Sequence, residues 1–286
     1  MLPPSSARGL TAAAVTAGFL ALVLLLLRCS DSVEYALASE QHTGPAPSLL
    51  PAASAASLKL NPPGEPAFGA VRLVLLSDTH THHSELEVPD GDILIHAGDY
   101  ALARDSAGRV REKSSFDAWL ATLPHLHKIF VQGNHDEGKP GSPISRLQHA
   151  TSLVDKLTEV VVRGRTVRIY GSPWQPQFKG WPTFLPPKDC EAMFAQIPKN
   201  LDVLITHTPM YKYGDGDNGY DAGDRGLLKA IKEKRPKLSV FGHIHDGWPR
   251  AGSVPGTGVV EGTTFINVAV TNNKAMLANP PTVYDI

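Results

Sequence analysis

Short apolar runs alternate with polar loops along most of the chain, and this pattern predicts the secondary structure. The runs are uninterrupted by polar residues, which is typical of strands buried on both faces of a sheet. They lie at residues 71–76, 93–96, 128–131, 167–170, 203–206, 238–241 and 265–270. The spacing of the runs leaves room for helices between them.

Two of the intervening segments have helical patterns. Residues 115–123 place four large apolar side chains on one helical face, namely Phe116, Trp119, Leu120 and Leu123. Residues 224–234 begin with Asp224, a residue type that caps helix N-termini. Buried strands joined by helices predict an α/β layered sandwich, which we place at residues 71–286.

The first 28 residues contain an uncharged, leucine-rich run at 10–27. As a helix this run would extend about 27 Å, close to the thickness of the hydrocarbon core of a bilayer. It predicts an N-terminal apolar helix that acts as a single-pass membrane anchor or as a signal segment. Cleavage after Ala38 is the alternative, and it would release the protein into the endomembrane lumen or outside the cell. Charged residues between the run and Ala38 favour the uncleaved anchor.

Residues 29–70 are rich in Ala, Pro and Ser, and repeated prolines disfavour regular structure there. This composition predicts a tether between the segment at 1–28 and the folded domain at 71–286. No repeat of fixed period is present in the sequence, which argues against a solenoid or a propeller.

Charge and cysteine content narrow the possible chemistry. The 27 basic and 28 acidic residues give a net charge of -1, without the basic excess of most nucleic-acid-binding proteins. Two cysteines cannot build a cysteine-rich zinc site, so any metal ion must be bound through nitrogen and oxygen. The 12 histidines, in contrast, cluster beside glycine and aspartate. This clustering is the first sign of a metal site.

Polar residues suited to metal binding come directly after predicted strands. They are Asp78, His80, Asp99, Asn134, His207, His243 and His245. Because open α/β sheets build their sites at the carboxyl ends of strands, one crevice could collect all of them. Imidazole, carboxylate and amide oxygen suit Mn, Fe or Zn. The pattern therefore predicts a site for two divalent or trivalent ions.

Each motif has an alternative interpretation when taken alone. Gly98-Asp99 could form an ordinary turn, and His207 could be a hydrogen-bonded core histidine. A turn has no need for the paired imidazoles of Gly242-His-Ile-His, however, and the motifs occur together in a fixed order. The combination favours a metal site over coincidence.

The order Asp-x-His, Gly-Asp, Gly-Asn-His-Asp, His and Gly-His-x-His resembles the calcineurin-like metallophosphoesterase superfamily. The resemblance spans residues 78–245 and implies a four-layer αββα sandwich with a binuclear metal centre. One ion would be held by Asp78, His80, Asp99 and His245. The other would be held by Asp99, Asn134, His207 and His243. Asp99 would then bridge the two ions.

The same resemblance implies that His135 is not a ligand. Paired with Asp136, it would sit over the metals as an acid or as a phosphate-contacting group. Segments 91–99, 169–174, 235–238 and 280–285 further resemble the metallophosphoesterase-domain (MPPED) phosphodiesterases.

The predicted function is hydrolysis of phosphate esters, with phosphodiesters favoured, by a hydroxide that bridges and is activated by two metal ions. Phosphomonoesterase or protein phosphatase activity is the alternative within the enzyme class. A catalytically weak, membrane-tethered binding protein of the same fold is the alternative outside it. The predicted partners are a phosphate-ester substrate and a membrane, without a nucleic-acid-binding patch.

Three histidines near these motifs are predicted not to bind metal. His82 and His83 are expected to be solvated loop residues, because most histidines are not ligands. His96 lies within an apolar strand, and we expect it in the core or behind the metal ligands.

Overall fold

The computed structural model describes residues 60, 64–136, 146–177, 184–185, 187–214, 223–245 and 256–286. The predicted anchor at 10–27 and most of the tether lie outside these residues. Among the residues that the structure describes, no helix is both long and apolar enough to cross a bilayer. The membrane anchor therefore stays a prediction from the sequence.

One sheet has the strand order β13-β1-β2-β3-β4. Strands β1 to β4 are parallel, and β13 pairs with β1 in the antiparallel direction. Their bounds are β1 (Arg72–Leu76), β2 (Ile93–His96), β3 (His127–Phe130), β4 (Thr151–Ser152) and β13 (Thr282–Asp285). The carboxyl ends of the four parallel strands thus lie along one edge of this sheet.

The second sheet has the order β11-β12-β10-β9-β6-β5. Strands β12, β10, β9 and β6 are parallel, and the outer strands β11 and β5 are antiparallel to their neighbours. Their bounds are β5 (Lys156–Val162), β6 (Arg165–Ser172), β9 (Val203–Thr206), β10 (Leu238–Phe241), β11 (Gly258–Val260) and β12 (Thr263–Asn267). A separate pair joins β7 (Gln175–Pro176) and β8 (Phe184–Leu185).

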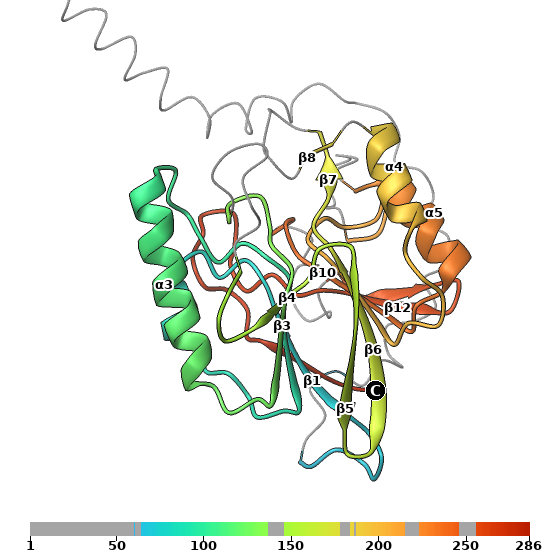
Figure 1. The fold of residues 1–286 in the computed structure, drawn as a ribbon, viewed down its shortest axis with the longest axis horizontal. Helices are drawn as coiled ribbons and strands as arrows, with labels where there is room; N and C mark the ends of the chain where they lie inside the picture. Colours follow the sequence, from blue (N-terminus) through green and yellow to red (C-terminus); the bar gives the residue numbers. More distant parts are fainter. Residues whose placement is uncertain are drawn as a thin grey trace, which may run out of the picture. The chain divides into compact units, whose positions relative to one another are not determined.

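Three apolar clusters stack the two sheets and the helices into layers (Figure 1). One cluster fills the space between the sheets. A second lies between the first sheet and α3 (Ser106–Thr122), and a third between the second sheet and both α4 (Pro187–Ala195) and α5 (Arg225–Lys234). Within the described residues this is the predicted αββα order of layers.

Strand β1 shows why the apolar runs are uninterrupted. Leu73 and Leu75 belong to the cluster between the sheets, whereas Val74 and Leu76 belong to the cluster beneath α3. Successive side chains of a strand point to opposite faces, so a strand covered on both faces needs apolar residues at every position.

The observed start of one predicted helix agrees with the sequence prediction, and that of the other does not. Helix α5 begins where Asp224 caps it, with the carboxylate accepting the N–H of Leu227 at 2.7 Å. Helix α3 begins at Ser106, capped by Asp105, well before the predicted start at residue 115. Its first half is largely exposed and polar, and therefore lacks the apolar spacing that revealed the second half.

The end of the predicted tether contacts the folded part. Leu60 forms an isolated antiparallel bridge with Tyr284 of β13 and packs against the cluster between the sheets. Arg72 donates a hydrogen bond to the carbonyl of Gly64 and pairs with Asp285 at 2.9 Å. Residues before 71 thus take part in the edge of the first sheet.

Candidate metal centre

The polar residues singled out in the sequence follow the carboxyl ends of strands from both sheets. Strands β1, β2 and β3 are followed by Asp78, Asp99 and Asn134. Strands β9 and β10 are followed by His207 and His243. All five side chains come from loops at strand ends, as the topology of a parallel sheet predicts.

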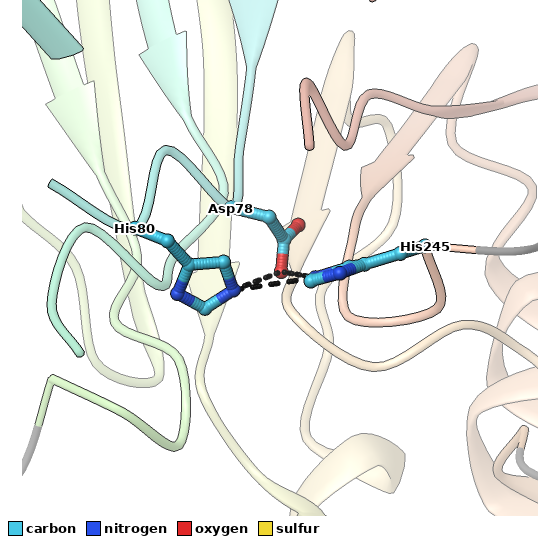
Figure 2. Close-up of side chains that lie close together, drawn as sticks. All are labelled: Asp78, His80 and His245. Carbon is cyan, nitrogen blue, oxygen red and sulfur yellow. Dashed lines mark hydrogen bonds and ion pairs between the residues drawn. The ribbon is translucent and has the colours of Figure 1, made fainter. Parts of the chain in front are cut away.

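Asp78, His80 and His245 form the first cluster (Figure 2). The Nε2 atoms of His80 and His245 are 3.3 Å apart, and His245 Nε2 lies 3.1 Å from Asp78 Oδ1. The other oxygen of Asp78, Oδ2, accepts hydrogen bonds from Ser77 Oγ and from the N–H of His243. These bonds leave Oδ1 of Asp78 facing the two imidazoles.

Asp99, His207 and His243 form the second cluster. Oδ2 of Asp99 lies 3.2 Å from Nε2 of His207, and the rings of His207 and His243 have centroids 5.0 Å apart. The candidate ligand atoms within each cluster all lie within 4.8 Å of one another. Nε2 of His207 is also 3.9 Å from Asp78 Oδ1, so the two clusters are adjacent.

In three of the histidines, a hydrogen bond at Nδ1 orients the ring so that Nε2 faces the cluster. Nδ1 of His80, His207 and His245 lies 3.0, 2.7 and 2.9 Å from the carbonyls of Ala101, Ala97 and Asn272, respectively. A carbonyl can only accept, so each Nδ1 carries a hydrogen, and in its neutral form each ring presents a lone pair on Nε2. This is the usual support for a metal-binding histidine.

Two buried acceptors fit the same interpretation. Among the described residues, Oδ1 of Asn134 is buried without a hydrogen-bond partner, and Nε2 of His207 is buried with the Asp99 carboxylate at 3.2 Å. Leaving a buried acceptor unsatisfied costs about 1–3 kcal/mol. Both atoms are ligand types that Mn, Fe and Zn accept, so cations at the two clusters would satisfy them. The donor set therefore fits the metal centre that the sequence predicts.

The electrostatics of the centre favour positive charge. Burial alone would raise the pKa of Asp99, but His207 and His135 hold it well below its usual value. Burial lowers the pKa of His207, yet Asp99 and Asp78 outweigh this effect and raise it to about 10. The carboxylates that favour an imidazolium here would equally favour a metal ion. Protons and metals therefore compete for this site.

The backbone that presents these residues adopts an unusual conformation. Asp78, His80, Asp99 and His243 have φ angles of 54, 40, 61 and 67°, in the left-handed region that side chains other than glycine rarely enter. Such conformations persist only where the surroundings enforce them, and they concentrate at functional sites.

Glycine is required at positions 133 and 242 because the carboxylates of the centre lie against the backbone there. A Cβ atom at Gly133 would lie 2.1 Å from Oδ1 of Asp99, and one at Gly242 would lie 2.1 Å from Oδ2 of Asp78. Any side chain at either position would displace a carboxylate of the centre.

His135 and Asp136 differ in how they relate to the clusters. The rings of His135 and His80 form a T-shaped pair with centroids 5.1 Å apart, and the backbone N–H of His135 donates to Oδ1 of Asp99 at 2.8 Å. Asp136 is 3% exposed, and its carboxylate accepts backbone N–H groups of Asp99, Tyr100, Ala101 and Gly133. These four bonds favour a role for Asp136 in holding the loops after β2 and β3, and its pairing with His135 stays a prediction.

The other histidines behave as two different types. His82 is partly exposed and pairs with Glu85 at 2.7 Å, as expected for a solvated residue, although it begins a short 3₁₀ helix (His82–Glu85) where a loop was predicted. The prediction for His83 was wrong, because His83 is buried and packs against Phe116 and Trp119. Helix α3 covers it, and the sequence contains no local signal of that contact.

The fold and this centre define the class of protein. The sequence matches the calcineurin-like phosphoesterase family over residues 71–247, and the chain belongs to that family. It is accordingly a metal-dependent phosphoesterase, a hydrolase whose family uses a centre of two metal ions.

Several proteins of known sequence are similar to this chain over most of its length. Metallophosphoesterase domain-containing protein 1 of Homo sapiens is 34% identical over 248 residues, covering 76% of this chain and 72% of the relative. The Mus musculus protein of the same name has the same identity and coverage. UPF0046 protein C25E10.12 of Caenorhabditis elegans is 33% identical over 244 residues, covering 76% of this chain and 81% of the relative. The resemblance to the metallophosphoesterase-domain group is thereby confirmed.

Proposed function

We propose that this protein hydrolyses phosphodiesters at two metal ions held by the adjacent clusters. In this proposal Asp78, His80, Asp99 and His245 bind one ion, while Asp99, Asn134, His207 and His243 bind the other. The observation that carries this proposal is the adjacency of two groups of three side chains that can bind metal. Within each group, the candidate ligand atoms lie within 4.8 Å of one another. Two such groups side by side suit the paired ions of phosphoesterases.

Asp99 is proposed as the residue shared by both ions. Its Oδ2 lies 3.2 Å from His207 in the second cluster. In the first cluster, burial lowers the pKa of His80, and Asp99 is the strongest influence that raises it. The charge of one carboxylate thus acts on both clusters, which supports the proposed bridging role.

When bound, two such ions neutralise phosphoryl oxygens and lower the pKa of a coordinated water. The chain itself supplies ligands of limited negative charge, since two aspartates are combined with neutral imidazoles and one amide. His135 is half-buried beside His80, where a protonated ring can contact the phosphoryl group or supply a proton to the leaving oxygen. Asp136 keeps the loops of Asp99 and Asn134 in register.

The proposed preference for diesters over monoesters is based on the difference in charge between these two classes of ester. A phosphomonoester has a second pKa near 6 and carries almost two negative charges at neutral pH, whereas a diester carries one. Enzymes that bind dianions commonly use arginine or lysine for the additional charge. In the described part of the chain, no lysine or arginine pairs with Asp78 or Asp99, whose ionic partners are histidines.

The test compares bis(p-nitrophenyl) phosphate with p-nitrophenyl phosphate, using the purified full chain before and after removal of metal by a chelator. We expect a higher kcat/KM for the diester, loss of activity on chelation, and recovery with Mn²⁺ or Zn²⁺. A higher kcat/KM for the monoester would contradict the proposed substrate class. Full activity after verified metal removal would contradict the mechanism itself.

A further inference from the structure

We propose that His96 is a positioning residue that fixes the two metal-binding loops after β1 and β2 relative to each other. It is not itself a metal ligand in this proposal. This role rests on the proposed metal centre. His96 acts on that centre through the hydroxyl of Thr79 and the backbone N–H of Gly98.

The hydrogen bonds of His96 connect the two loops. Its Nδ1 accepts the backbone N–H of Gly98 at 3.2 Å, and its Nε2 lies 3.2 Å from Oγ1 of Thr79. Thr79 stands between Asp78 and His80, and Gly98 directly precedes Asp99. One imidazole therefore contacts both chain segments that present the aspartates of the centre.

The tautomer follows from these partners. A backbone N–H can only donate, so Nδ1 of His96 is unprotonated and Nε2 carries the hydrogen. Nε2 then donates to the hydroxyl oxygen of Thr79. Burial lowers the pKa of His96 to about 3, so the ring keeps this neutral form at physiological pH. The imidazole of His96 therefore keeps both hydrogen bonds across the physiological pH range.

The ring is held from the helix side and by the sheet. His96 is 1% exposed, and its ring forms a T-shaped pair with Phe116 of α3 at a centroid distance of 4.8 Å. Phe130, its register partner on β3, lies at a centroid distance of 5.8 Å. A buried ring packed in this way has little freedom to shift, so its two nitrogens define a fixed distance between the loops.

The loops themselves need such support. Asp78, His80 and Asp99 all have positive φ angles, which are strained for residues other than glycine and persist only where the surroundings enforce them. Backbone bonds from Asp78 N to Gly98 O and from His80 N to Asp99 O join the loops directly. His96 adds one side-chain bond to each loop, to Thr79 after β1 and to Gly98 after β2, while Asp136 connects the loop after β2 to the loop after β3.

The experiment separates hydrogen bonding from packing. His96→Phe keeps an aromatic ring in the packed position but removes both bonds, whereas Thr79→Val removes only the hydroxyl partner. We measure Mn²⁺ and Zn²⁺ affinity by competition with a chelator, well below the melting temperature, together with kcat and KM for bis(p-nitrophenyl) phosphate. Both variants should weaken the affinity for metal, His96→Phe by the order of 10- to 100-fold found when outer-shell partners of metal ligands are removed.

Two features of the result distinguish positioning from a general structural role. In the doubly substituted protein, the fold-loss of metal affinity should be smaller than the product of the two single fold-losses. Each substitution alone already breaks the same bond, the one between His96 and Thr79. A conservative variant, His96→Gln, should recover part of the affinity, because its amide nitrogen can reach Thr79.

The matched control is His125→Asn. His125 is another buried histidine, bonded through Nε2 to the carbonyl of Pro89 and located before the amino end of β3, away from the clusters. This control should lower the melting temperature while leaving metal affinity unchanged.

Wild-type metal affinity in both His96→Phe and Thr79→Val would overturn the inference while leaving the proposed function intact. If His96→Phe does not fold, Thr79→Val decides the question alone. A wild-type protein that fails to bind two ions would instead overturn the proposed function, and the positioning role would fall with it.

Discussion

Replacing Asp99 with alanine is expected to remove both metal ions and to reduce phosphodiesterase activity by about 1,000-fold or more. Asp99 is 2% exposed, contacts His207 at 3.2 Å and influences the pKa of His80 in the other cluster. The loss of one carboxylate therefore affects both proposed coordination spheres. Elemental analysis of the purified variant, together with its rate on bis(p-nitrophenyl) phosphate, measures the effect.

The control for Asp99→Ala is Asp202→Ala. Asp202 is also buried, but it lies before β9 at the opposite end of that strand, where it pairs with Lys237 at 2.8 Å. Its removal should reduce stability and leave two ions per chain. Two ions retained by the Asp99→Ala variant would rule out the bridging assignment.

Replacing His135 with alanine is expected to leave both ions bound and to slow the chemical step. The half-buried ring stands beside His80 without belonging to either cluster of candidate ligands. A general acid typically contributes about 100- to 10,000-fold, and least where the leaving group departs readily as an anion. The rate should therefore fall steeply with alkyl or nucleotide diesters and much less with nitrophenyl diesters.

Three other outcomes for His135→Ala have distinct meanings. Equal losses on both kinds of substrate would indicate that His135 positions phosphate and would exclude acid catalysis. Loss of metal would contradict both functions. A lower melting temperature with little change in rate would show that the histidine is structural. The main-chain bond from His135 N to Asp99 is preserved in the variant, so its effects report on the ring.

The sequence predicted the central strands well because each is covered on both faces. Strand β5 was not predicted, because its alternate residues face solvent and its sequence mixes lysine, threonine and glutamate with valine. Strand β13 was also missed, since it is short and lies at the edge of its sheet. Edge strands with one exposed face lack the continuous apolar run that identified the others.

The seven proposed ligands were predictable because parallel strands bring their carboxyl ends together, and short motifs mark each end. The supporting residues were harder to predict. Asp136 bonds to the backbone of a different loop, and His83 is buried by helix α3. Such contacts depend on which segments the fold places together. The bonds of Asp136 go to backbone N–H groups, which almost every residue carries. Residue type alone therefore gives no sign of these roles.

The central claim is that two adjacent ions share one carboxylate. Electron paramagnetic resonance of the Mn²⁺-loaded protein tests it directly, because Mn²⁺ ions joined through a common ligand couple their electron spins. We predict the spectrum of a spin-coupled pair at two ions per chain, and its absence in Asp99→Ala loaded under the same conditions. The spectrum of isolated Mn²⁺ in the fully loaded wild-type protein would contradict the shared centre.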